Sequence, residues 1–109
     1  MLVTELVKNI NFNDSCVNEL VYKNGTVLLN IDLCMWKQKQ YQDGETELKG
    51  IVLKFLNTTN YNWVSEKRES DIDYDSIIAI TCEEDIVKVV LEDEEVSILT
   101  FKCREVIID

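Results

Sequence analysis

Hydrophobic and polar residues alternate along most of the chain from residue 16 onward. A period of two places successive side chains on opposite faces of a β-strand, whereas a helix requires apolar residues at intervals of three and four. No window after residue 16 has a convincing helical spacing. The pattern predicts a mainly β protein, an antiparallel meander of about six to eight strands that forms a sandwich or a partly open barrel.

The clearest predicted unit is a hairpin over residues 16–35, with Asn24-Gly25 between two β-rich runs. Asn-Gly tolerates positive φ at both central positions of a type I′ turn, so a two-residue turn is expected. That turn pairs Tyr22 with Val27 and Leu20 with Leu29. The face expected to lie in the core carries Leu20, Tyr22, Val27, Leu29, Ile31, Leu33 and Met35.

The third predicted strand, over residues 51–55, conflicts with a tight turn at Asp43-Gly44. A regular two-residue hairpin would pair Cys34 with Leu53, which turns the apolar face of the third strand away from that of the first hairpin. Either a bulge within residues 36–41 or a longer irregular loop resolves the conflict. Both solutions disturb the segment that holds Trp36 and Tyr41.

Residues 57–70 form the longest predicted connection, which is rich in Asn, Thr, Ser and charged side chains. Loops of this length without regular structure are uncommon in compact domains and tend to be functional or mobile. Tyr61 and Trp63 lie inside this segment.

The last third of the chain predicts three antiparallel strands, with turns at Glu84-Asp85 and over residues 92–95. The opposite face of these strands is also largely apolar, so we expect the first part of the sheet or an N-terminal segment to cover it. Residues 2–10 fit a short helix or a short strand. The first face of the three strands is predicted to carry Ile78, Ile80, Cys82, Val87, Val89, Leu91, Val96, Ile98 and Thr100.

The composition indicates one acidic domain over residues 1–109, with 21 acidic and 11 basic side chains and a formal charge of −10. This charge repels nucleic-acid phosphates and speeds encounter with a basic partner, so we expect no nucleic-acid binding. The apolar runs are shorter than the roughly 20 residues of a spanning helix, and no basic segment precedes an apolar stretch at the N-terminus. We therefore expect a cytoplasmic protein that does not bind membranes.

The side chains offer little catalytic or metal-binding chemistry. The chain has no His, which removes the commonest general base, and the acidic residues lie mainly in predicted turns. Asp71-x-Asp73-x-Asp75 begins like a calcium loop, but Ser76 stands where the sharp turn needs Gly and Cys82 where the loop needs Glu. The sequence thus predicts no enzyme, no metal and no cofactor.

The four cysteines are far apart and include no Cys-x-x-Cys pair. Zinc-binding cysteines usually come as closely spaced pairs, and no secretory signal favours disulfides. We expect Cys16, Cys34, Cys82 and Cys103 to be free thiols that pack as small apolar side chains.

Two tryptophans and two tyrosines beside predicted irregular structure are the best candidates for a partner-binding surface: Trp36, Tyr41, Tyr61 and Trp63. Trp and Tyr are enriched at interface hot spots, although they can equally close the ends of a small β core. The main hypothesis is a non-enzymatic protein that binds a basic protein partner. The alternatives are a small-ligand carrier or carboxylate-dependent enzyme with a pocket between the sheets, and self-association through a strand edge.

The stretch Phe12-Asn13-Asp14-Ser15, followed at once by the predicted hairpin, resembles the opening of a group of small bacterial β-rich proteins. In that group a Phe/Leu-His-Asp-Ser stretch leads into two long strands, and a later Leu-x-Phe segment is matched here by Leu53-Lys54-Phe55. Some members are grouped with immunity proteins of bacterial toxin systems, so the resemblance implies an inhibitor of a toxin. Asn13 replaces the His of the group, which removes any role of that imidazole. The remaining residues predict a turn that starts the first strand, with Phe12 anchored in the core.

Overall fold

The computed structural model describes residues 1–42, 44, 46–72 and 74–109. Within these residues the chain forms a short N-terminal helix, eight strands and two 3₁₀ turns, which confirms the mainly β class and the predicted number of strands. The elements are α1 (Val3–Asn9), β1 (Cys16–Lys23), β2 (Thr26–Cys34), η1 (Met35–Lys37), β3 (Leu48–Leu56), β4 (Thr59–Val64), η2 (Glu69–Asp71), β5 (Asp75–Glu83), β6 (Ile86–Glu92), β7 (Val96–Lys102) and β8 (Glu105–Ile108).

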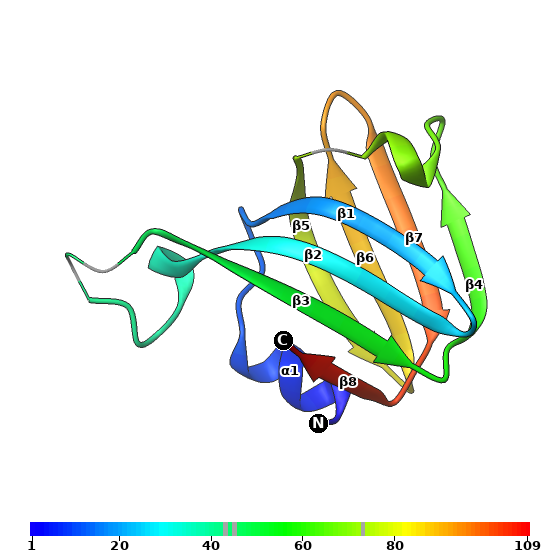
Figure 1. The fold of residues 1–109 in the computed structure, drawn as a ribbon, viewed down its shortest axis with the longest axis horizontal. Coiled ribbons are helices and arrows are strands. Elements are labelled where there is room, and N and C mark those ends of the chain that lie inside the picture. Colours follow the sequence, from blue (N-terminus) through cyan, green and yellow to red (C-terminus); the bar gives the residue numbers. More distant parts are fainter. Residues whose placement is uncertain (43, 45, 73) are drawn as a thin grey trace.

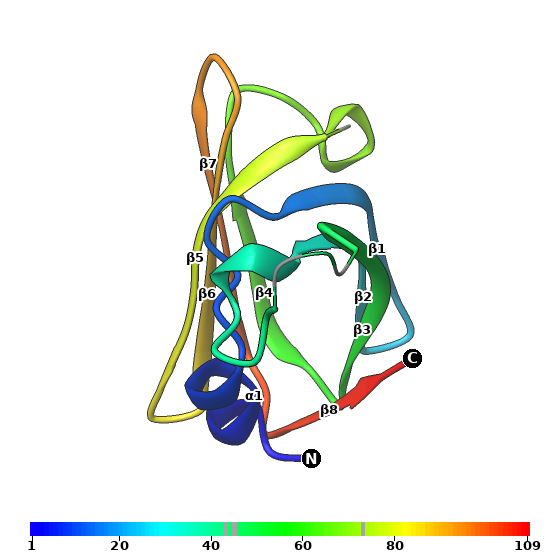
Figure 2. The ribbon, with the colours of Figure 1, turned by 90° about the vertical axis from the view of Figure 1, so that its left-hand side faces the viewer.

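All strands pair antiparallel in one open sheet with the order β4-β7-β6-β5-β1-β2-β3-β8. The sheet folds over between β5 and β1, so that β1, β2 and β3 cross over β5, β6 and β7 as a second layer (Figures 1 and 2). Apolar side chains from both layers fill the space between them, and Phe55 contacts Phe101 edge to face with 5.0 Å between ring centroids.

The two layers are structural repeats of each other. The hairpins β1–β2 and β5–β6 have the same pairing register at a constant offset in sequence, so that the pair Leu20–Leu29 corresponds to the pair Ile80–Val89. Both contain the same bulge, and both close with two residues at positive φ, at Asn24-Gly25 and at Glu84-Asp85. We call the unit β1–β4 the first half and the unit β5–β8 the second half.

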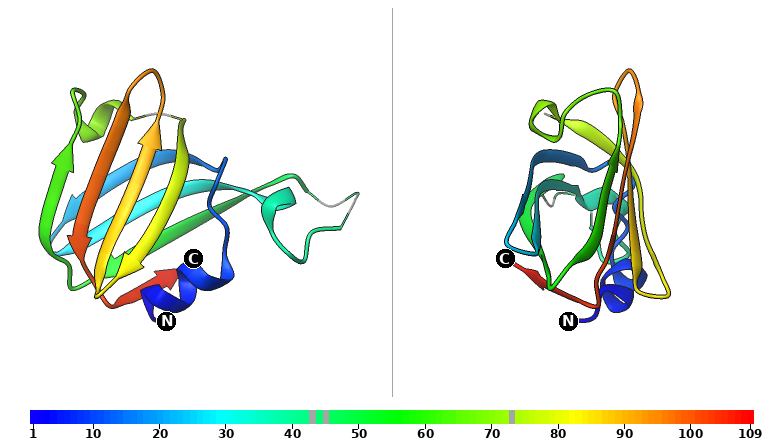
Figure 3. Two further views of the ribbon diagram at one scale, coloured as in Figure 1. Left: turned by 180° about the vertical axis from the view of Figure 1, so that it is seen from behind. Right: turned by 90° about the vertical axis from the view of Figure 1, so that its right-hand side faces the viewer.

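The two halves exchange their last strands. β4 follows β3 but pairs with β7 in the other half, and β8 follows β7 but pairs with β3. Each crossing strand is tied to the hairpin turn beside it, because the Thr58 N–H donates to the Gly25 carbonyl and the Cys103 N–H donates to the Asp85 carbonyl, both at 2.8 Å. Figure 3 shows these crossings from the other side of the molecule.

The two halves also enter their first strands in the same way. Asp14 and Tyr74, which correspond to each other at the same offset, both have positive φ. The Asp14 N–H donates to the Ile77 carbonyl and the Tyr74 N–H donates to the Val17 carbonyl, so each half caps the other where β1 meets β5. The backbone hydrogen bonds of Asp14 and Tyr74 therefore connect the two layers where β1 meets β5.

The first hairpin follows the predicted register, and the third strand resolves its conflict through a long connection. Cys34 pairs with Leu48 instead of Leu53, so the whole of residues 35–47 lies between the end of β2 and the start of β3. In this register Ile51 lies opposite Ile31, on the core face. The predicted turn at Asp43-Gly44 includes Asp43, which lies outside the described residues.

The prediction of an irregular loop over residues 57–70 is wrong for Thr59–Val64, which form β4. The β-forming residues Thr59, Tyr61 and Trp63 alternate along it, while the intervening Asn residues made the segment look like a loop. The register shifts between Thr59 and Asn62, and Asn60 has positive φ, so a bulge accommodates the Asn-rich sequence.

The predicted register of β7 is wrong by one residue. Residues 93–95 form the loop between β6 and β7, so Glu92 pairs with Val96, and a shift of one position turns every side chain of β7 to the other face. Leu99 is therefore buried, whereas Val96 is half exposed on the outer face. The bulge in β5 similarly exposes Ile78.

The expected cover over the outer face of the second half is also incomplete. Ile86 remains 51% exposed there, and the strands that α1 contacts include β5 and β8. Within the described part of the chain, no helix is long and apolar enough to cross a membrane.

Candidate functional site

The connection from β4 to β5 and the loop from β6 to β7 lie together at one end of the molecule (Figure 1). We call this region the acidic end and define it as residues 65–72 together with residues 93–95. Lys67 connects the first of these segments to the start of β5 and to the loop from β6 to β7. The Lys67 Nζ atom lies 2.8 Å from Oδ1 and 2.7 Å from Oδ2 of Asp75, and 3.6 Å from Oδ2 of Asp93.

The Lys67–Asp75 pair is largely buried. Asp75 begins β5 with its side chain 1% exposed, and that of Lys67 is 21% exposed. A carboxylate withdrawn from water is stable only with a charged or hydrogen-bonding partner, which Lys67 supplies. The hydrogen bond from Lys67 to Asp75 raises the pKa of the lysine above 10.5, so the ammonium group is charged at neutral pH.

The backbone around Lys67 is anchored as firmly as its side chain. The indole Nε1 of Trp63 donates to the Lys67 carbonyl at 2.8 Å. Ser65 Oγ and Ser97 Oγ are hydrogen-bonded at 2.6 Å, and Ser65 Oγ also accepts the Lys67 N–H at 3.2 Å. These contacts join the connection to β4 and β7, so the acidic end is attached to the sheet at several points.

Exposed carboxylates surround this anchored lysine. A hollow of about 270 Å³ is lined by Lys67 and by four acidic residues. Glu66 lies close to Glu95, and their repulsion raises the pKa of Glu95 above its ordinary value of 4.5. Since the charge of Lys67 is already taken up by Asp75 and Asp93, the hollow carries a net negative charge. The four acidic lining residues are Glu66, Asp93, Glu94 and Glu95.

Two of the predicted partner-binding aromatics lie beside the acidic end. Tyr61 and Trp63 alternate along β4, both half-buried against the core. Tyr61 stacks on Tyr22 with 4.0 Å between ring centroids and an angle of 4° between the planes. Burial, and secondarily the nearby Glu69, raises the pKa of Tyr61. Tyr22, predicted in the core, is instead 44% exposed and extends the aromatic surface onto β1.

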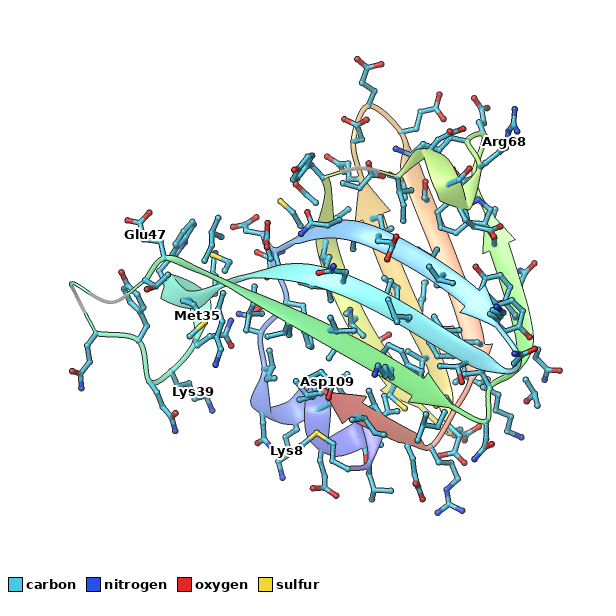
Figure 4. All side chains as sticks on the ribbon, in the orientation of Figure 1. Lys8, Met35, Lys39, Glu47, Arg68 and Asp109 are labelled. Carbon is cyan, nitrogen blue, oxygen red and sulfur yellow. The ribbon has the colours of Figure 1, made fainter. Side chains whose placement is uncertain are left out.

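The other two predicted aromatics lie at the opposite end. Trp36 is 49% exposed on η1, and Tyr41 is half-buried in the connection between β2 and β3. Figure 4 marks this region by Met35 and Lys39, far from Arg68 at the acidic end. The four predicted residues therefore form two separate groups, and a compact interface can include one pair.

The stretch Phe12-Asn13-Asp14-Ser15, which carries the resemblance, is a structural corner. Phe12 is buried, and the Nδ2 group of Asn13 donates to the Ile78 carbonyl at 3.0 Å. Ser15 is fully buried, and its Oγ accepts the Cys34 N–H at 2.8 Å. The stretch joins the start of β1 to the end of β2 and to β5, in agreement with the predicted turn and core anchor.

The cysteines are free thiols, as predicted. Burial is the main cause that raises the pKa of each one, so all four are weak nucleophiles at neutral pH. Cys103 Sγ donates to the carbonyls of Leu56 and Glu105. Their roles in the described structure are packing and local hydrogen bonding.

Among the described residues, no group of three His, Cys, Asp or Glu side chains could hold a metal ion. Asp73, the central residue of the calcium-loop comparison, lies outside the described residues. Its neighbour Asp75 is engaged by Lys67.

The pairing of Lys67 with Asp75 was not predicted from the sequence, because acidic residues before a β-strand normally indicate a solvated strand entry. One signal was available in the spacing of the two hairpin turns, Asn24-Gly25 and Glu84-Asp85. A repeat with that spacing would have aligned Asp75 with Ser15 at the entry to the first strand.

Comparison of the chain with protein families, with curated proteins and with solved structures finds no match.

Proposed function

We propose that this chain is a non-enzymatic binding protein whose acidic end receives a basic segment of a protein partner. The observation that carries this proposal is the negative hollow, in which four carboxylates surround one lysine that is already engaged by Asp75. A lysine or arginine side chain of a partner would relieve the repulsion that raises the pKa of Glu95.

The surroundings of the hollow support a protein partner. Trp63 and Tyr61 lie on the adjacent strand, and aromatic side chains contribute much of the binding energy in typical interfaces. The overall charge of −10 steers a basic partner toward the protein and raises the association rate at low salt. Affinity then comes from the aromatic contacts and the hollow, and encounter speed from the long-range field.

The resemblance of residues 12–55 to small bacterial β-rich proteins, some of which are grouped with toxin-immunity proteins, suggests that the basic partner is a toxin. An immunity-type protein binds a toxin and blocks it without chemistry of its own, and a basic toxin domain fits the charge of the acidic end. The alternative of a ligand carrier with a pocket between the sheets is less well supported, because apolar side chains such as Phe55, Phe101 and Leu53 fill that space.

The experiment that tests this proposal is a pull-down from the source cell with two variants of equal charge. The first variant carries Glu66→Gln, Glu94→Gln and Glu95→Gln in the acidic end. The control carries Glu5→Gln, Glu47→Gln and Glu105→Gln, three exposed residues elsewhere. We expect a basic protein to be retained by the wild type and the control at low salt, and retention by the first variant to fall about tenfold or more.

Two results would overturn the proposal. If the control loses the partner as fully as the first variant, only net charge matters and the acidic end is not a site. If no basic protein is retained at low salt by the wild type, the protein does not act through a basic partner.

A further inference from the structure

Two adjoining hollows lie at the end of the molecule that holds Trp36. They are lined by the C-terminal end of α1, the segment that leads to β1, the end of β2 with the connection that follows it, and residues 78–80 of β5. Their volumes are about 590 and 290 Å³, and they share five lining residues. We call them together the lysine cleft. The shared residues are Lys8, Asn9, Ile10, Gln38 and Lys39.

The lysine cleft combines an apolar floor with a polar rim. Ile10, Leu33 and Met35 line the larger hollow and belong to the apolar core or pack against it. Lys8 and Lys39 are exposed and come from different walls, α1 and the β2–β3 connection (Figure 4). A cleft of this size, with a few polar groups over an apolar surface, is typical of small-molecule sites.

The charge of the lysine cleft is opposite to that of the whole protein. Its described lining residues include Lys8, Lys37 and Lys39 but no carboxylate, in a chain with 21 acidic side chains. Lys37 forms an ion pair with Asp14 at 3.3 Å. Lys8 and Lys39 form no ion pair with any carboxylate of the residues that the structure describes. Among the described residues, therefore, no carboxylate competes with a ligand for these two ammonium groups.

Hydrogen bonds connect the β2–β3 connection to the segment that leads to β1 in the absence of a ligand. The side chain of Gln38 accepts the Asn11 N–H at 3.0 Å and donates to the Asn11 carbonyl at 2.7 Å. The same Nε2 group donates to the Cys34 carbonyl at 2.8 Å, at the end of β2. Because the walls are held by these bonds, a ligand does not have to order them, which reduces the entropic cost of binding.

We propose that the lysine cleft binds a small organic anion with an apolar body. The anionic group would lie between the ammonium groups of Lys8 and Lys39, and the body would lie on Ile10, Leu33 and Met35. A purely inorganic anion would interact with the two lysines but leave the apolar floor exposed to water. A neutral apolar molecule would cover the floor but make no ion pair with the lysines. This inference is independent of the proposed function, because the cleft and the acidic end lie at opposite ends of the molecule and share no residue.

The test is an NMR titration of the ¹⁵N-labelled full chain with octanoate, with octanol and inorganic phosphate as separate arms. We expect saturable shifts for octanoate at residues of the cleft, including Gln38 and Tyr41, and at least about tenfold weaker binding for the other two ligands. Lys8→Gln with Lys39→Gln should weaken octanoate binding about tenfold. The matched control, Lys88→Gln with Lys102→Gln, removes the same charge from exposed positions of the second half and should bind like the wild type.

Several outcomes would overturn the inference. Equal affinity for octanol would show that the lysines play no part, and equal affinity for phosphate would show that the floor plays none. Shifts confined to other residues, or an equal loss in the control variant, would place the effect outside the lysine cleft. Since all four substituted lysines are exposed, these variants are expected to fold, and their unchanged amide spectra away from the cleft would verify it.

Discussion

The acidic end and the lysine cleft occupy comparable positions in the two halves of the fold, yet they carry opposite charge. Each lies between the segment that enters the first strand of its half and the connection that follows the second strand. In the first half that connection is long, residues 35–47, and contributes Lys37 and Lys39. In the second half it is short, residues 93–95, and all of it is acidic. The repeated strands provide the same framework in both halves, and the side chains that each connection contributes to the lining differ in charge.

The buried polar residues below the two ends show the same divergence. Ser15 and Asp75 occupy corresponding positions of the repeat, and both are almost completely buried just before or at the start of their strands. Ser15 is neutral, and one backbone N–H satisfies its oxygen. Asp75 is an acid and requires an ammonium group from a neighbouring connection. The second half therefore depends on Lys67, whereas the first half is stabilised locally.

The largest effect is expected for Lys67→Met. This change leaves the Asp75 carboxylate buried without a charged partner, and breaking a buried pair from one side costs roughly 3–5 kcal/mol. Urea unfolding followed by fluorescence would measure the loss. The double variant Lys67→Met with Asp75→Asn should recover a large part of it, because the uncompensated charge is then absent.

The pH dependence of stability provides an independent test of the Lys67–Asp75 ion pair. The pKa of Lys67 is raised in the folded state, so its contribution to stability is fully present below pH 10.5 and is lost as pH rises through the folded pKa. The wild type should lose stability in that alkaline range more steeply than Lys67→Met. A loss below about 1 kcal/mol for Lys67→Met at neutral pH would contradict the assigned role.

The equivalent change in the first half, Ser15→Ala, should have a smaller effect. It removes a neutral acceptor and leaves the buried Cys34 N–H unpaired, at a cost of about 1–3 kcal/mol. The exposed Ser70→Ala serves as the matched control and should unfold like the wild type. If Ser15→Ala costs as much as Lys67→Met, the two halves are equally dependent on their buried polar residues.

The two hairpin turns allow a third comparison with a still smaller effect. Both turns have positive φ at two residues, which suits Asn24-Gly25 but strains Glu84-Asp85. Replacing Glu84-Asp85 by Asn-Gly should stabilise the protein by about 0.5–1 kcal/mol, and Gly25→Val should destabilise it by about 1 kcal/mol or more. Thermal melts of the two variants should shift in opposite directions; shifts in the same direction would contradict the shared turn type.

The local parts of the fold were predictable where one strong turn signal governed the pairing. Asn24-Gly25 determined the register of the first hairpin, and Leu20 does pair with Leu29. Where the turn signal was weak, the register failed, because the acidic run before Val96 is compatible with loops of different length and similar composition. A difference of one residue then reversed the faces of a whole strand.

The exchange of β4 and β8 between the halves was not predictable, because it depends on pairing between segments far apart in the chain. The repeat itself was hidden as well. Between residues 16–32 and 76–92, Val27 and Val87 are the only identical pair in the alignment. What the halves share is the period of apolar positions and the position of the turn, and many β hairpins share those properties.

The candidate sites were only partly predictable from the sequence, because they too depend on contacts between segments far apart in the chain. The tryptophans and tyrosines could be selected by residue type, but their division between two ends follows from the topology. Lys8 and Lys39 lie far apart in the sequence and share one cleft only because the end of α1 comes close to the connection that follows β2. The pairing of Lys67 with Asp75 likewise requires the turn of the chain through η2.

The smallest predicted effect concerns the charge of the acidic end alone. Repulsion from Glu66 is the main cause that raises the pKa of Glu95, so the protein holds a proton on Glu95 above the ordinary value of 4.5 and releases it as pH rises. A carbon-detected NMR titration should show a midpoint above 4.5 in the wild type and a lower one in Glu66→Gln. The matched control, Glu105→Gln on β8, should leave it unchanged. Because both carboxylates face solvent, we expect no measurable change in unfolding. An unaltered midpoint in Glu66→Gln would mean that Glu66 and Glu95 do not repel each other across the hollow.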